Sequence, residues 1–192
     1  MFIKLEYSDE VIRLEIEGDY LGALNQTYSE WLADQTESKL LSAMLEHWFV
    51  IFNLDKFGKE FDQWKELWNM AYEKIEDPVF SFFLGYIMKT SSYLFLGKRF
   101  GYGGESLDTI WNLGNKLREE AYKRAPECAV FRIGHIYQQE HDYYRQNSDE
   151  ELSEIRDTFP VPSIVNEYFR RIFNAEDDEI CLPKFEDYRN NT

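Results

Sequence analysis

Residues 61–75, which read FDQWKELWNMAYEKI, show the helical pattern of the chain most clearly. Their apolar side chains recur every three or four residues and share one face of an α-helix: Phe61, Trp64, Trp68, Ala71 and Ile75. An equivalent stripe comes just before them and consists of Leu41, Met44, Leu45, Trp48 and Phe52. Period-2 alternation bounded by turns is almost absent from the chain. The sequence therefore predicts an all-α fold of seven to eight helices.

Capping and breaking residues locate the ends of the expected helices. The first helix should run from Ser8 to Glu17, because Gly18 can adopt the left-handed conformation that ends a helix. Asp19 can then cap a second helix, whose apolar residues are Leu21, Leu24, Tyr28 and Trp31. A fifth helix is expected from Pro78 to Gly97 and is apolar on almost all sides, which is typical of the centre of a bundle. Lys89 in its middle makes a membrane span unfavourable, by about 2.5 kcal/mol or more.

The second half of the chain continues the helical pattern. A sixth helix should end before Pro126, with an inner face of Leu107, Ile110, Gly114, Leu117 and Ala121. A seventh is marked by Val130, Gly134, Tyr137, His141 and Tyr144. A short acidic helix over 149–157 and a last helix over 164–173 are separated by Pro160 and Pro162. We expect one all-α domain over residues 1–174, followed by an acidic tail over 175–192 that is either docked or mobile.

Two internal sequence similarities suggest stacked helical hairpins. A shift of 37 residues superposes Trp31 on Trp68, and a shift of 49 superposes Phe82–Ile87 on Phe131–Ile136. At 18–24, GDYLGAL, the chain resembles the turn of a tetratricopeptide-type repeat. Further positions that resemble this family are Leu84-Gly85, Ile133-Gly134 with Tyr137, and Ala121 with Pro126. The resemblance implies a short solenoid that binds protein or peptide on a concave face. Because both shifts differ from the family's ~34 residues, an irregular helical bundle is the alternative.

Composition and charge narrow the class of partner. The 192 residues are 44% hydrophobic and 17% aromatic, enough for a well-buried core, and 21 basic against 36 acidic side chains give a net charge of −15. Such a surface repels phosphate backbones, so we expect no nucleic-acid binding. Only Cys128 and Cys181 are present and the start resembles no signal peptide, so the sequence favours a soluble protein of the reducing cytoplasm, with no membrane partner.

The negative charge is concentrated near the end of the chain. Residues 140–192 hold 6 basic and 14 acidic side chains, which is −8 of the total −15. A field of this sign attracts a basic protein and speeds its encounter. The predicted partner-binding carboxylates are Asp149, Glu150, Glu151, Glu154, Asp157, Glu176, Asp177, Asp178 and Glu179. Tyr143, Tyr144 and Tyr168 are expected to anchor the contact.

Small-ligand and metal chemistry have weaker support in the sequence. Backbone N–H groups and two cations before the sixth helix form a possible anion site, from Lys98, Arg99, Gly101, Gly103 and Gly104, for which a plain connector is the alternative. The three histidines, His47, His135 and His141, lack the spacing of a metal site. His141-Asp142 resembles the central dipeptide of His-Asp phosphohydrolases in those two residues only. Cys128 is expected in the core. No catalytic motif is found, and no cofactor or metal is expected.

These observations favour a non-catalytic, acidic binding module that occludes a basic protein partner. It is similar in general character to immunity proteins that neutralise bacterial toxins, which implies a toxin such as a nuclease as the partner. The first alternative is a tetratricopeptide-like adaptor or co-chaperone that holds a peptide in a groove. The second is a small-ligand-binding protein or enzyme that uses the glycine-rich connector.

Overall fold

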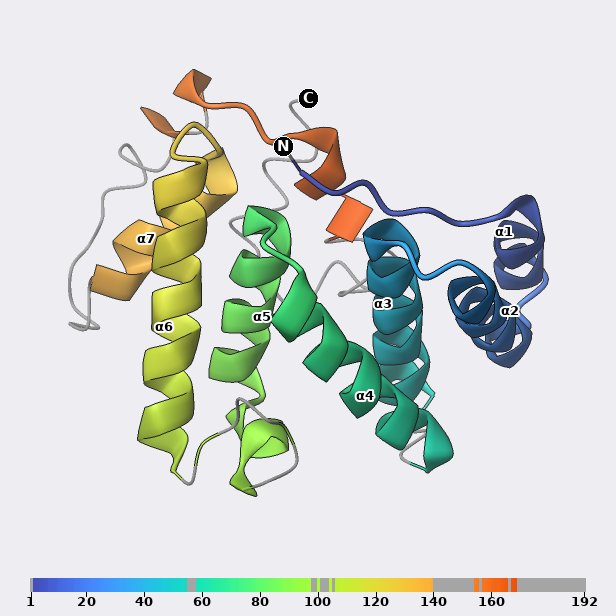
Figure 1. Ribbon diagram of the computed structural model, residues 1–192. Helices are drawn as coiled ribbons and strands as arrows, with labels where there is room; N and C mark the ends of the chain where they lie inside the picture. The colour runs from blue at the N-terminus through green and yellow to red at the C-terminus, as the bar shows by residue number, and fades with distance from the viewer. Residues whose placement is uncertain are drawn as a thin grey trace. The chain divides into compact units, whose positions relative to one another are not determined.

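Helices make up nearly all regular structure in the described part of the chain (Figure 1). The computed structural model describes residues 2–54, 58–97, 100, 104, 106–139, 154–155, 157–165 and 167–168, with the backbone alone at 52–53 and 136–139. Within these residues the α-helices are α1 (Asp9–Ile16), α2 (Tyr20–Ala33), α3 (Glu37–Asn53), α4 (Lys59–Lys74), α5 (Pro78–Thr90), α6 (Leu107–Arg124) and α7 (Ala129–Gln139), and the 3-10 helix is η1 (Ser92–Phe95). The predicted all-α fold is confirmed.

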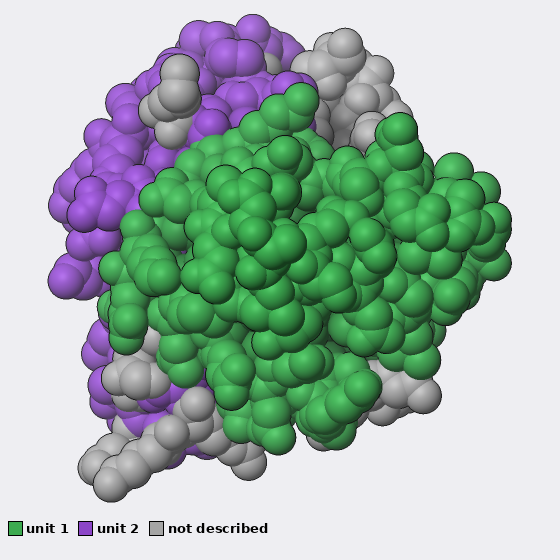
Figure 2. Space-filling view, turned by 45° about the vertical axis from the view of Figure 1, so that its right-hand side comes forward, with its two compact units in different colours: residues 1, 3–75, 167–180 green, residues 2, 76–166, 181–192 purple. Residues whose placement is uncertain are grey.

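The chain divides into two compact units, which Figure 2 distinguishes by colour. Among the described residues, unit 1 contains 3–54, 58–75 and 167–168, and therefore α1 to α4. Unit 2 contains residue 2 and the described part of 76–165, and therefore α5, η1, α6 and α7. The boundary falls between Ile75 and Glu76, shortly before Pro78, where the sequence predicts that the fifth helix begins. A single domain over 1–174 stays a prediction.

In unit 1 each helix packs on the next one in the chain, and the predicted caps set the helix ends. The Ser8 side chain accepts the N–H of Val11 at the start of α1, and the Asp19 side chain accepts that of Gly22 at the start of α2. Between them Gly18 has a φ of 77°, the left-handed conformation that glycine adopts without strain. Trp64 and Trp68 of the predicted apolar stripe on α4 (Lys59–Lys74) are buried. Their rings meet edge to face, with the ring centres 5.6 Å apart.

In unit 2, α5 begins as predicted but ends earlier. The Asp77 side chain accepts the Phe80 N–H at 3.0 Å, and Pro78 occupies the first turn. The prediction that this helix continues to Gly97 is wrong, because α5 ends at Thr90 and η1 follows. Three hydroxyl residues, Thr90 to Ser92, stand at this point, and such side chains compete with the helix for backbone hydrogen bonds. The Thr90 hydroxyl donates to the Tyr86 carbonyl oxygen at 3.2 Å.

The helices α5 and α6 lie side by side and run in opposite directions (Figure 1). Of the predicted inner face of α6, Ile110, Gly114, Leu117 and Ala121 are buried. Leu107 is 46% exposed, so its assignment to that face is wrong. It is the first residue of α6 and lies before the part of the helix that α5 covers. No helix among the described residues is both long and apolar enough to cross a membrane.

The segment after α7 packs on the start of that helix. Ile155 is buried against Ala129 and Ile133, with Phe159 and Val161 beside them. The backbone N–H of Ala129 donates to the Pro160 carbonyl oxygen at 3.2 Å. Residues 160–162 are non-helical, as the two prolines predict. Helical turns lie on either side of them, at 154–155, 157–158, 163–165 and 167–168.

Candidate protein-binding site

Helix α1 presents an apolar face that no described element covers. Ile16 is 81% exposed and Ile12 is 42% exposed. Residues four apart in a helix lie on the same face, so the two isoleucines form one apolar strip. Leu21, near the start of α2, is also exposed. Isolated exposed apolar residues are common on protein surfaces, but a β-branched side chain this exposed, paired with a second one a turn away, marks a candidate contact surface.

The opposite side of α1 is fixed in unit 1. Val11 is fully buried, and the Ser8 hydroxyl that caps the helix donates to Glu30 Oε1 on α2 at 2.6 Å. The Gln26 amide donates to the same oxygen at 2.7 Å. Because both a buried side chain and a charge-assisted hydrogen bond hold α1, the Ile12–Ile16 strip is a property of the folded unit rather than of a frayed end.

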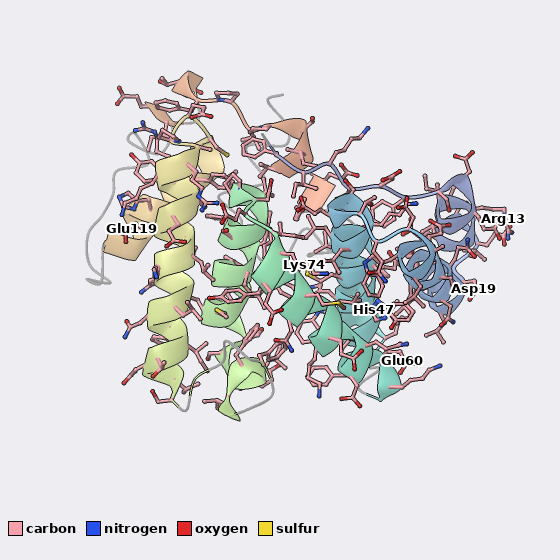
Figure 3. All side chains as sticks on the ribbon, in the orientation of Figure 1. Arg13, Asp19, His47, Glu60, Lys74 and Glu119 are labelled. Carbon is pink, nitrogen blue, oxygen red and sulfur yellow. The ribbon has the colours of Figure 1, made fainter. Side chains whose placement is uncertain are left out.

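The segment that carries this strip is rich in carboxylates. Residues 9–19 contain five acidic side chains and one basic side chain, a net charge of −4. The single cation, Arg13, is engaged by two of the acids, with Nη2 2.7 Å from Glu10 Oε1 and Nη1 2.6 Å from Glu17 Oε1. The hydrogen bond from Arg13 lowers the pKa of Glu10. Figure 3 shows Arg13 and Asp19 at this end of the α1–α2 pair. The segment therefore stays negative at neutral pH.

An exposed apolar strip in a segment of net negative charge has two features of a protein contact surface. Apolar side chains at the centre supply affinity by leaving water, whereas the surrounding charges steer a partner of opposite sign and set its orientation. We call Ile12, Ile16 and the acidic residues of 9–19 the α1 face. Helical periodicity predicts the α1 helix but does not indicate which of its faces the rest of the chain covers, so the sequence alone does not single out this face.

Most of the partner-binding residues that the sequence predicts lie outside the described residues. These are Tyr143, Tyr144, Asp149, Glu150, Glu151, Glu176, Asp177, Asp178 and Glu179. Glu154 and Asp157 are described and are exposed, as a contact surface requires. Tyr168 is fully buried, so the prediction that it anchors a partner is wrong. Its ring belongs to the apolar positions of a helical turn at 167–168, and spacing alone did not separate core from interface tyrosines.

The predicted anion site at the connector before α6 is described at one position. Lys98, Arg99, Gly101 and Gly103 lie outside the described residues. Gly104 is buried, and its carbonyl oxygen accepts the Gly97 N–H at 3.0 Å. A Cβ atom at Gly104 would lie 2.8 Å from Thr109 Cγ2, so close packing accounts for glycine there. Anion binding by this connector stays a prediction.

Two residues with potential chemistry are core residues. His47 on α3 is fully buried; its Nδ1 lies 2.7 Å from the Ala43 carbonyl oxygen, and its ring meets Tyr28 edge to face (Figure 3). Burial lowers the pKa of His47, which is therefore neutral at pH 7. Burial also raises the pKa of the Cys128 thiol to about 11. Among the described residues no three His, Cys, Asp or Glu side chains gather as metal ligands would.

No protein-family model, curated protein or solved structure matches this chain. The fold and the candidate site define an all-α chain with an exposed, acidic helix face in unit 1. The resemblance to tetratricopeptide repeats stays a prediction.

Proposed function

We propose that the chain is a non-catalytic binding module that uses the α1 face to bind a basic protein partner. The observation that carries this proposal is the exposure of Ile16, 81%, within a segment of net charge −4. Exposed apolar surface favours association, and the carboxylates of the same segment favour a partner of positive charge over an acidic one. The finer form of the proposal is occlusion: the module covers a functional surface of the partner, as toxin-immunity proteins do.

A nuclease-type toxin is the partner class that this charge fits best. Enzymes that bind nucleic acid carry clusters of Lys and Arg that neutralise phosphates. Carboxylates of the α1 face would present negative charge to the same cations. The overall charge of −15 strengthens this attraction at long range.

The test begins with capture of partners from the lysate of the native cell, with washes at low and at high salt. The proposal requires one dominant basic protein, whose association weakens as salt rises. The purified partner is then titrated with the chain while its own activity is measured. Stoichiometric loss of that activity supports occlusion, and full activity in the complex contradicts it. Many clients that resist high salt would instead favour the peptide-binding adaptor.

Two variants test whether the α1 face makes the contact. Ile12→Ser with Ile16→Ser removes the apolar strip, and we expect affinity to fall about tenfold or more, since each isoleucine buried contributes about 1.5–3 kcal/mol. The matched control is Leu32→Ser, which alters an exposed apolar residue at the other end of α2. Equal affinity of all three proteins would remove α1 from the interface.

A second pair tests the charge. Glu10→Gln with Glu17→Gln changes the net charge of residues 9–19 from −4 to −2 and should slow association. Glu66→Gln with Glu73→Gln makes the same change at two exposed carboxylates of α4. Slowing confined to the first pair supports the α1 face, whereas equal slowing shows that only total charge matters. Sedimentation of the chain alone shows whether a second copy covers the strip instead.

A further inference from the structure

Helix α7 is covered on two opposite sides. One side meets α5 and α6: the Phe131 ring centre lies 4.9 Å from that of Phe82, and Arg118 Nη2 donates to the Gly134 carbonyl oxygen at 2.7 Å. Successive residues of an α-helix are about 100° apart, so three other residues of α7 point the opposite way. This opposite side, which we call the α7 face, consists of Ala129, Arg132 and Ile133.

The α7 face is covered by a short segment from further along the chain, which we call the covering segment, residues 154–155 and 157–161. Ile155 is buried against the two apolar residues of the face, and Phe159 and Val161 pack beside it. Ile155 and Phe159 are four residues apart, and the segment has helical turns before Phe159. The two side chains therefore reach the α7 face in the way that the apolar anchors of an amphipathic helix enter a groove.

Polar contacts add specificity to this packing. The Arg132 guanidinium carbon lies 4.0 Å from the centre of the Phe159 ring, a close cation–π contact. Arg132 Nε donates to the Pro126 carbonyl oxygen at 3.0 Å, which holds the guanidinium in position. The Pro160 carbonyl oxygen accepts the N–H of Ala129 at 3.2 Å, a first-turn donor that the helix itself leaves unsatisfied. The α7 face thus offers an apolar patch, a cation for an aromatic ring and a donor for a backbone carbonyl oxygen.

Few contacts hold the covering segment. Ile155 is its one buried residue among those described, whereas Phe159 is half-buried. Among the described residues, a single backbone hydrogen bond joins the segment to α7. The segment is tethered to α7 through residues 140–153, and a tethered ligand acts at an effective concentration on the order of millimolar. A free peptide that makes the same contacts competes with this effective concentration.

We propose that the α7 face is a docking site for a peptide segment of a partner protein, and that the covering segment occupies this site in cis. The peptide that fits has an aliphatic and an aromatic side chain four residues apart on a helical turn, with the aromatic ring over Arg132. The covering segment displays this chemistry, because Ile155 and Phe159 make the corresponding contacts. Occupation in cis lowers the apparent affinity for the peptide, since only the chains with an open face bind it. The site lies in unit 2 and does not depend on the function proposed for α1.

The test uses a fluorescein-labelled peptide with the sequence of residues 152–163, titrated with the full chain while fluorescence anisotropy is recorded. The unaltered chain should bind the peptide weakly, because its own covering segment competes. Phe159→Ala in the chain removes the ring over Arg132 and loosens the covering segment. This variant should bind the peptide about tenfold more tightly than the unaltered chain does. A peptide that carries Phe159→Ala should bind neither chain, because it lacks the aromatic anchor.

A second substitution tests recognition of the aromatic ring. Arg132→Gln, added to the Phe159→Ala chain, should abolish the tenfold gain, because glutamine offers the ring no charge. The matched control is Lys123→Gln in the same background, which removes an exposed cation of α6 and should keep the gain. Arg132 and Phe159 are half-buried, so both variants should fold, as circular dichroism would verify.

Hydrogen exchange tests the site without any substitution. An excess of the unlabelled peptide, above millimolar concentration, should displace the covering segment of the unaltered chain. Exchange should then accelerate in residues 157–161, while the amides of α7 stay protected.

The proposal is overturned if the peptide binds neither chain, if it binds both equally, or if Arg132→Gln and Lys123→Gln have the same effect. Sedimentation examines a second copy as the occupant. A dimer of the unaltered chain that Phe159→Ala abolishes would place the covering segment of one copy on α7 of the other, and would also overturn the proposal.

Discussion

Replacing Gly85 with alanine tests how closely α5 and α6 approach each other. A Cβ atom at this position would lie 2.5 Å from the carbonyl oxygen of Gly114 and 3.2 Å from Leu117 Cβ. The first of these is a backbone atom, so α6 must move as a whole to admit the methyl group. Overpacking of this kind costs about 1–3 kcal/mol, and more rigid sites lie at the upper end. Alanine regains about 1 kcal/mol of helix propensity over glycine. We therefore expect Gly85→Ala to lower the free energy of unfolding by roughly 2 kcal/mol.

Urea unfolding followed by circular dichroism measures the global effect, and hydrogen exchange read by mass spectrometry assigns it to peptides. Exchange should accelerate in the peptides of α5 and α6 and change less in those of α1 to α4, which belong to unit 1. Asn112→Ala is the control, because Asn112 is exposed on α6 and the change should be neutral or slightly stabilising. If Gly85→Ala proves as stable as the unaltered chain, the two helices do not approach as closely as described.

Three further changes test single interactions. Asp77→Ala removes the acceptor for the Phe80 N–H and should destabilise the chain by about 1–2 kcal/mol in urea unfolding, whereas Asp77→Asn should retain most of that stability. Burial lowers the pKa of His47 below its usual ~6.5, so the unfolded chain binds the proton more tightly and stability should fall as the pH drops below about 6.5. That part of the pH dependence should vanish in His47→Gln. If it persisted in this variant, burial of His47 would not be its cause. The Cys128 thiol, with its pKa raised to about 11 by burial, should react with iodoacetamide at neutral pH only after unfolding, as peptide mass mapping would detect.

Local chemistry explains why several helix ends could be predicted. Ser8, Asp19 and Asp77 each accept a backbone N–H three residues later, and this interaction depends on nearby residues only. The end of α5 depends on competition between helix and 3-10 geometry over Thr90 to Ser92, which apolar periodicity does not detect. The prediction that ran this helix to Gly97 failed for that reason.

The candidate surfaces were harder to predict because exposure and burial are tertiary properties. Ile12 and Ile16 resemble core positions in the sequence, and only the packing of Val11 and Ser8 onto the rest of unit 1 shows that they face outward.

The carboxylates of the α1 face attract a basic partner through water, and at physiological ionic strength such attraction is screened beyond about 8 Å. Partner association should therefore weaken steeply as salt rises. Association that did not change with salt would contradict a contact that these carboxylates steer.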